Sequence, residues 1–260
     1  MAWRWLAGAL ALIIVAGCGS DDTAAQDHGV LTVYVSAPLT GPAGGDGRDI
    51  ADGARMAFAE GSPTVRGFKI EVEYLDVAGR NETRSDPVTA AANARTATRD
   101  STTIAYIGEL DSATTRTSLP ITNSAGILHV APGGGAEDLV RDEPFNDEVP
   151  ASVQATGERT FAQLVPTYED GDRPEPLAPS ELPAAGQDFI KAFRAKYDRK
   201  PGPYAAYGYE AMASVLAALE RTTDPESRDA VIEAYFDGTE RDSVLGAYAI
   251  TAEGETTLAR

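Results

Sequence analysis

The sequence predicts an α/β fold in which helices cover both faces of a mostly parallel sheet. Strand-length apolar runs alternate with helix-length segments along residues 30–132, at a spacing typical of parallel strands joined by crossover helices. The run at residues 30–37 (VLTVYVSA) is mostly apolar, as expected of a buried strand. Even without its first 17 residues, the chain of 260 residues is long enough for the core of one large domain or two small ones.

The first unit of the pattern is a strand, a loop and a helix. Residues 38–47 follow the strand, contain two prolines and four glycines, and are predicted to form a loop. Residues 48–60 then carry apolar side chains at helical spacing. The same β-loop-α arrangement recurs along the chain, without sequence similarity between the units.

The next elements continue the alternation. Residues 68–77 alternate as a strand, and residues 86–100 form an alanine-rich helix with Ser85 or Asp86 as its cap and Pro87 in its first turn. The remaining elements of this region are predicted as strands at residues 102–110 and 127–132, a helix at residues 112–124, and a short strand at residues 161–165. A three-layer sandwich follows from this order.

Residues 166–183 interrupt the pattern. This segment has five prolines and five acidic residues with almost no apolar periodicity, and it is predicted to be a linker. Beyond it the sequence predicts helices at residues 184–197, 204–222 and 227–236, and then a strand and turn at residues 247–258.

The amino terminus is typical of a secretory signal peptide. Residues 1–17 carry one positive charge, Arg4, and an apolar run at residues 6–15 that is too short to span a bilayer. No other segment of the sequence approaches membrane length. The protein is therefore expected outside the cytoplasm.

Cys18 is the only cysteine of the chain and directly follows this signal. The sequence Val15-Ala16-Gly17-Cys18 resembles the lipobox of bacterial lipoproteins, which implies that Cys18 carries a diacylglyceryl group. Residues 18–29 would then be a lipidated tether, and the lipid would be the protein's only contact with the membrane, at the bacterial cell surface or in the periplasm. The alternatives are a plain signal peptide and an uncleaved anchor.

The charge and the residue types exclude several classes of function. A formal net charge of -18 argues against nucleic-acid partners and against binding of anionic lipid by the protein surface. The chain has two histidines, no G-x-S-x-G motif and no cluster of metal-ligand residues. We therefore expect that the protein is not an enzyme and that it binds no metal and no cofactor. We expect His129, within a strand, to be a core or sheet-face residue.

A candidate binding site lies in three loops, at residues 38–47, 109–112 and 133–136. In an open parallel sheet such loops meet at the carboxyl ends of the strands, where helix amino termini point inward. The third predicted helix opens with Asp111 and Ser112, so its hydroxyls and its first amides, those of Ala113 and Thr114, could face a carboxylate. Alternatively, Asp111 and Ser112 only cap the helix, and the glycines at 133–135 form a flexible turn.

The chain also resembles a known family, the solute-binding proteins of branched-chain amino acid ABC transporters, or extracellular ligand-binding receptors, with the type I periplasmic-binding fold. The matching motifs, in chain order, are Ala37-Pro38-Leu39-Thr40-Gly41-Pro42, Gly47, Gly53-Ala54-Arg55-Met56-Ala57, Ile107-Gly108-Glu109-Leu110-Asp111-Ser112-Ala113-Thr114-Thr115, Ala125-Gly126-Ile127-Leu128, Pro132, Pro203-Tyr204-Ala205-Ala206-Tyr207-Gly208-Tyr209-Glu210-Ala211 and Asp242-Ser243-Val244-Leu245-Gly246. Their order and spacing extend over most of residues 30–258.

The resemblance implies roles for four residues. By position, the hydroxyl of Ser112 would hold the α-carboxylate of a bound amino acid, and Leu110 would line the wall of the site. The backbone carbonyl of Gly133 would receive the ammonium group, and Tyr204 would be an aromatic wall of the side-chain pocket.

The chain departs from the family at two of its site positions and in its second lobe. Gly135 stands where the family often has a threonine, and Asp46 where some members have an aromatic residue. The first lobe corresponds to residues 30–166 and 203–260, whereas the second lobe is reduced to residues 167–202, a linker and one helix. The family's ligand contacts from that lobe have no counterpart in this sequence.

Two functions follow from these observations. The first is a lipid-anchored solute-binding component of an ABC importer, working with its permease on branched-chain amino acids or related small carboxylates, in a truncated form with impaired binding. The alternative is a one-lobed interaction or sensory module that binds no solute. Because the helix at 184–197 has lost the sheet it covers in the family, we expect its stripe of Phe189, Phe193 and Tyr197 to self-associate or to be poorly ordered.

Overall fold

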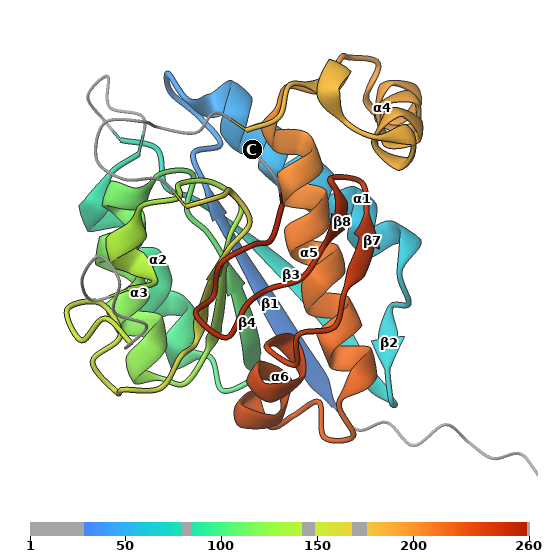
Figure 1. Ribbon diagram of the computed structural model, residues 1–260. Helices are drawn as coiled ribbons and strands as arrows, with labels where there is room; N and C mark the ends of the chain where they lie inside the picture. Colours follow the sequence, from blue (N-terminus) through green and yellow to red (C-terminus); the bar gives the residue numbers. More distant parts are fainter. Residues whose placement is uncertain (1–28, 80–84, 142–148, 168–175, 259–260) are drawn as a thin grey trace, which may run out of the picture.

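The fold is built on one six-stranded sheet. The protein is represented by a computed structural model that describes residues 29–79, 85–141, 149–167 and 176–258. The strand order is β2-β3-β1-β4-β5-β6, and every pair is parallel except β2 with β3 (Figure 1). The strands are β1 (Val30–Ala37), β2 (Thr64–Val65), β3 (Phe68–Asp76), β4 (Thr103–Ile107), β5 (Leu128–Ala131) and β6 (Phe161–Gln163). The predicted α/β fold with a mostly parallel sheet is confirmed.

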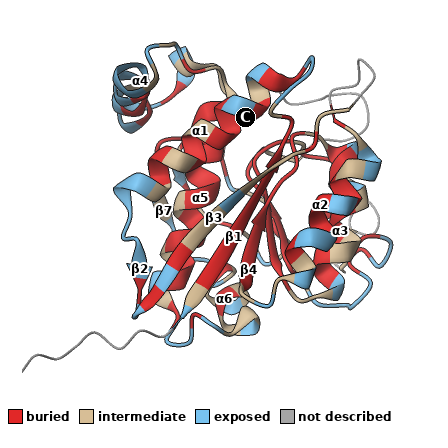
Figure 2. Ribbon diagram, turned by 180° about the vertical axis from the view of Figure 1, so that it is seen from behind, coloured by how far each residue is buried: buried red, intermediate tan, exposed pale blue. Residues whose placement is uncertain are grey.

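Helices cover both faces of this sheet. One layer contains α2 (Pro87–Arg99) and α3 (Ser112–Ser124), and the other contains α1 (Gly44–Glu60), α5 (Tyr204–Arg221) and α6 (Arg228–Tyr235) (Figure 1). Alternate residues of β1 serve the two layers, because Val33 and Val35 pack in the core with α1 and α5 while Tyr34 packs with residues of α2. Colouring by burial shows β1 and β4 as mostly buried, whereas β3 is largely intermediate or exposed (Figure 2).

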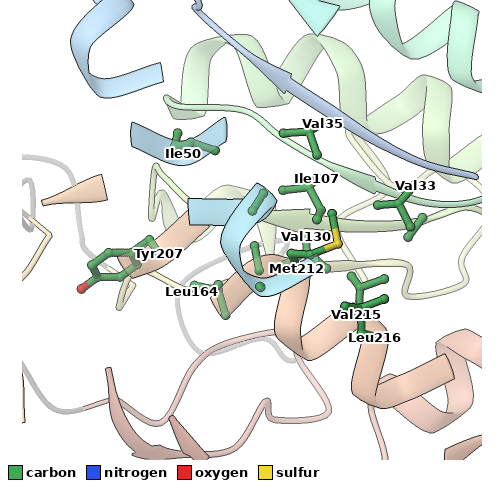
Figure 3. Close-up of a cluster of buried hydrophobic side chains, with 14 of the residues drawn as sticks. Val33, Val35, Ile50, Ile107, Val130, Leu164, Tyr207, Met212, Val215 and Leu216 are labelled. Carbon is green, nitrogen blue, oxygen red and sulfur yellow. The ribbon is translucent and has the colours of Figure 1, made fainter. Parts of the chain in front are cut away.

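The larger core lies between the sheet and the layer of α1 and α5. Val33, Val35 and Ile107 from the strands meet Ile50 of α1 and Met212 of α5 there (Figure 3). All five side chains are 2% exposed or less. Burying a side chain of this size contributes roughly 1.5–3 kcal/mol, so this layer carries much of the stability of the fold.

The helices α1 and α5 pack with their backbones in contact. A Cβ atom on Gly53 would lie 2.0 Å from the carbonyl oxygen of Ala205, and one on Gly208 would lie 2.2 Å from that of Ile50. Only glycine fits at either position, since real Cβ atoms do not approach other atoms so closely. This contact brings the carboxyl-terminal part of the chain back to the helix that follows β1.

The first helix begins earlier than the sequence pattern indicates. We expected residues 38–47 to be a loop and the helix to start at 48, but α1 starts at Gly44. The amide of Gly47 donates to the carbonyl of Ala43, and a Cβ on Gly47 would lie 2.0 Å from the carbonyl oxygen of Pro38. Close packing against the preceding loop therefore draws these glycines into the helix despite their low helix propensity.

The carboxyl-terminal segment differs most from its predicted structure. Instead of a strand from 247 it contains the hairpin of β7 (Arg241–Ser243) and β8 (Gly246–Tyr248), followed by a turn. Gly254 occupies this turn with φ at 89°, a conformation that glycine adopts readily. The amide of Gln163 in β6 donates to the carbonyl of Gly254 at 3.0 Å, so the turn lies along the edge of the sheet.

The aromatic stripe at 184–197, which we expected to self-associate or to be poorly ordered, instead packs against its own chain. The helix α4 (Ala184–Tyr197) follows a short 3-10 turn at Pro179–Glu181, and its Phe189 and Phe193 are 5% and 0% exposed. The ring of Phe189 meets that of Tyr209 in α5 at 5.1 Å, and the hydroxyl of Tyr197 donates to the carbonyl of Asp52 in α1 at 3.0 Å. The seat is thus formed by α1 and α5 of the same chain.

An ion-pair cluster holds the end of α4 against α1. The guanidinium of Arg199 binds the carboxylates of Asp49 and Asp52, the latter at 2.6 Å, and lies 4.7 Å from the centre of the Phe193 ring. The amide of Gly202 donates to Asp49 at 2.7 Å. Burial raises the pKa of Asp49 from its ordinary value, and the hydrogen bond from Arg199 opposes that rise.

Among the described residues, no helix has both the length and the apolar character needed to cross a bilayer. The predicted signal peptide, the lipidation at Cys18 and the tether at 18–29 lie outside the described residues, except for Gly29 at the end of the tether.

Replacing Phe193 by alanine tests whether α4 is part of the core. Because this side chain is fully buried, we expect Phe193→Ala to lower the free energy of unfolding by about 3–5 kcal/mol, measured by urea denaturation. The neighbouring exposed residue provides the control, and Arg194→Ala should change stability by less than about 0.5 kcal/mol. Equal stability of the two variants would show that α4 is not packed in the folded protein.

Candidate functional site

The candidate site lies where the parallel strands end. The segments that follow β1, β4 and β5 leave the same edge of the sheet, and α1 and α3 begin in the first two of them. Helix amino termini at such an edge present unpaired amides and a positive electrostatic potential. This is the arrangement that the sequence predicted for the three loops.

Ser112 is at the centre of this edge and contacts the glycine loop (Gly133, Gly134 and Gly135). Its side chain is buried, and its Oγ accepts hydrogen bonds from the amides of Gly135 at 3.2 Å and Ala136 at 3.3 Å. Two loops that follow neighbouring strands are therefore joined by one hydroxyl.

The glycine loop approaches the 110–112 segment too closely for any other residue. A Cβ on Gly133 would lie 2.3 Å from the carbonyl oxygen of Leu110, and one on Gly134 would lie 2.7 Å from the Oγ of Ser112. Gly134 also has φ at 73°. The alternative of a freely flexible turn does not describe this loop, because its backbone is held against Leu110 and Ser112.

The amino end of α3 is partly occupied by its own cap. The carboxylate of Asp111 accepts from the amide of Thr114 at 3.0 Å, and the Thr114 hydroxyl donates to the carbonyl of Asp111 at 3.0 Å. Asp111 therefore caps α3, in agreement with the alternative interpretation given from the sequence. Of the two amides expected to face a solute carboxylate, that of Thr114 is committed to the cap, and Ala113 lies on the exposed side of the turn.

The structure brings together only some of the predicted site residues. Leu110, Ser112 and Gly133 meet in one place, as described above. Tyr204 is the first residue of α5 and packs, half-buried, against the core on the other face of the sheet. It therefore belongs to a different helix layer from Ser112.

Sequence reasoning missed a buried carboxyl group beneath this site. Glu109 is 0% exposed, and its two oxygens accept from the hydroxyls of Tyr106 at 2.7 Å and Ser36 at 3.0 Å. Asn93 of α2 in turn donates to the Ser36 Oγ at 3.1 Å. Burial raises the pKa of Glu109 to about 7. The signal in the sequence is a charged residue two positions after the apolar run Ile104-Ala105-Tyr106-Ile107.

His129 is a neutral core residue, which confirms its prediction. Its Nε2 donates to the carbonyl of Gly108 at 2.6 Å, and its Nδ1 accepts from the Thr122 hydroxyl at 2.9 Å. Burial lowers its pKa to about 4. Within the described ranges there is no group of three or more acidic, histidine or cysteine residues that could hold a metal ion.

Solved structures with a similar fold include solute-binding proteins. A leucine-binding protein, LivK, from Thermotoga maritima is 17% identical with a TM-score of 0.66, and the match covers 87% of this chain and 93% of that one. The substrate-binding protein LivJ from Streptococcus pneumoniae, in complex with isoleucine, is 16% identical with a TM-score of 0.65, covering 87% and 93%. A solute-binding protein from Rhodopseudomonas palustris, in complex with 3,4-dihydroxybenzoic acid, is 14% identical with a TM-score of 0.68, covering 87% and 90%.

These structural similarities establish the fold of the chain. The chain has the type I periplasmic-binding fold, which is the fold of substrate-binding proteins of branched-chain amino acid ABC transporters. No protein-family model and no curated protein sequence matches the chain.

Two glycine substitutions test how closely the glycine loop approaches Ser112. Gly134 and Gly157 have φ at 73° and 77°, but a Cβ on Gly157 would have no atom within 4 Å. We expect Gly157→Ala to cost about 1–2 kcal/mol for its backbone conformation, and Gly134→Ala to cost more because it also displaces Ser112. Urea denaturation measures both, and equal losses would show that the loop is not held against Ser112.

Proposed function

We propose that this protein is the extracytoplasmic solute-binding component of an ABC importer, and that its solute is a branched-chain amino acid or a related small carboxylate. The observation that carries the proposal is the arrangement at Ser112. A hydroxyl at the amino end of α3 is fixed by the amides of Gly135 and Ala136, at the carboxyl edge of a parallel sheet. A prearranged hydroxyl beside a helix amino terminus is suited to a carboxylate.

The structural neighbours support a carboxylate as the recognised group. LivJ holds isoleucine, and the Rhodopseudomonas palustris protein holds 3,4-dihydroxybenzoic acid. These two compounds differ in size and in the presence of an amino group, but each carries one carboxylate. We therefore assign Ser112 to the carboxylate and leave Leu110, Ala113, Thr114, Gly133 and Tyr204 as proposed contacts of the remaining parts of the site.

The same proposal assigns a role to each region of the chain. Residues 30–166 and 203–260 are proposed to form the solute-binding lobe, and residues 167–202 to be the remnant of a second lobe. The described residues of that remnant contain the short turn at Pro179–Glu181 and α4 but no strand. With little of a second wall to close over the solute, the affinity should be low.

Replacing Ser112 by alanine tests the proposed carboxylate contact. The probes are L-leucine, L-isoleucine and 3,4-dihydroxybenzoate, titrated by calorimetry into the chain from residue 20 onward. We expect at least one to bind, and Ser112→Ala to weaken it by about one to two decades, because a hydrogen bond to a charged group is worth roughly 1.5–3 kcal/mol.

A second serine of the same helix provides the control. Ser124 is exposed at the end of α3, where its hydroxyl donates to the carbonyl of Pro120 at 2.7 Å. Ser124→Ala should leave the affinity unchanged. Affinity that is equal in Ser112→Ala and the wild type would exclude this pose, and no binding by any probe would contradict the proposed solute class.

Lipid anchoring at Cys18 is tested in cells that process bacterial lipoproteins. We expect the wild type to partition into a detergent phase and Cys18→Ala to remain in the aqueous phase, because two or more acyl chains anchor a protein stably. Partition of both proteins into the aqueous phase would contradict the anchor.

A further inference from the structure

The Glu109 carboxyl group joins three elements beneath the candidate site. It lies two residues after the end of β4, and it accepts from Tyr106 on that strand and from Ser36 on β1. Asn93 of α2 extends the network by donating both to Ser36 and to the carbonyl of Asp76, at 3.1 Å and 3.2 Å. The hydrogen bonds from Asn93 to Ser36, from Ser36 to Glu109 and from Tyr106 to Glu109 all point toward Glu109, so the network is arranged for an ionised acceptor.

Among the described residues, the groups that act on this carboxyl supply no positive charge. They are the hydroxyls of Tyr106, Ser36 and Ser118, which favour its ionised form, and the carboxylate of Asp111, which disfavours it. His129 of β5 reaches the cluster through its ring, 4.9 Å from that of Tyr106, and is neutral. Dipoles alone therefore oppose the cost of burying this charge.

The backbone links Glu109 to Ser112 and to the glycine loop. Glu109 is bonded to Leu110, whose carbonyl lies against Gly133, and Ser112 follows two residues later with its Oγ on the amides of Gly135 and Ala136. A shift of the 109–112 segment would therefore act on the glycine loop through these close contacts and through its hydrogen bonds to Ser112.

We propose that Glu109 is a positioning residue of the candidate site, whose ionisation sets how the 109–112 segment presents Ser112 to the glycine loop. Ionised, its two oxygens accept from Tyr106 and Ser36. When it takes up a proton, the new O–H needs an acceptor, so the hydrogen bonds of this network rearrange and the segment is held differently. That this segment contacts a solute rests on the proposed function. The coupling between the ionisation of Glu109 and the position of Ser112 requires no solute.

The direction of the pH dependence follows from burial. The pKa of Glu109 is about 7 in the folded protein, above its ordinary value of 4.5. The stability that protonated Glu109 contributes is therefore fully present below pH 4.5 and is lost as the pH rises to about 7. Over that interval this group raises the equilibrium constant of unfolding about 300-fold.

Nuclear magnetic resonance on the chain from residue 20 onward tests the coupling without any solute. We expect the amide signals of Gly135 and Ala136 to titrate with one midpoint near pH 7 in the wild type and to lose that transition in Glu109→Gln. Glu210→Gln is the matched control, because Glu210 is also buried but is paired with Arg241 at 2.9 Å in another part of the fold. The control should keep the transition.

A second variant keeps the carboxyl group, so it tests the proposal even if Glu109→Gln does not fold. Tyr106→Phe removes one hydroxyl that favours the ionised form, so the midpoint should rise by at least about half a pH unit. A flat wild-type profile, a transition retained in Glu109→Gln, or an unmoved midpoint in Tyr106→Phe would overturn the proposal. If these amides titrate as expected while no carboxylate probe binds, the positioning role stands and the proposed function fails.

Discussion

The rest of the structure depends on the contact between α1 and α5. Gly53 and Gly208 allow the two backbones to touch, and this contact attaches residues 203–260 to the sheet formed by the first part of the chain. The same pair of helices closes the larger core over β1 and β4 and provides the seat of α4. A side chain at either glycine would separate the helices and open both surfaces together.

A second close contact, between the glycine loop and the 110–112 segment, organises the candidate site. Here the backbones meet around a polar group, the hydroxyl of Ser112, whereas the contact between α1 and α5 is apolar. Polar groups extend inward from it to the Glu109 carboxyl and the Ser36 and Asn93 side chains. A site supported by such a network is rigid as long as every hydrogen bond is satisfied, and it responds as a unit when one changes.

Sequence periodicity predicted the elements that repeat a simple local pattern. The bounds of β1, α3 and α4 agree with the prediction, and Asp86 caps α2 with Pro87 in the first turn as expected. Ser112, Leu110 and the glycine loop were placed together because parallel strands end at one edge of a sheet. These features depend on residue order and on topology, both of which can be derived from one sequence.

Tertiary contacts decided the features that the sequence did not predict. The glycines before residue 48 join α1 because Gly47 packs against Pro38, and the stripe of α4 is covered because Tyr209 and Arg199 meet it there. The burial of Glu109 likewise arises from β1, β4 and α2 together. Each depends on side chains that are distant in the sequence, and periodicity carries no information about such pairs.

The turn at Gly254 also determines how the sheet ends. β6 is the last strand of the order, and an uncovered last strand presents backbone donors and acceptors to which another chain can add a strand. Gly254 accepts from the amide of Gln163, and a Cβ at its position would lie 2.2 Å from the carbonyl oxygen of Phe161, so the turn is pressed onto this edge. At the opposite edge, β2 pairs antiparallel with only the first two residues of β3, so it covers only the start of that strand. The fold thus protects the β6 edge of its sheet against growing into an intermolecular sheet.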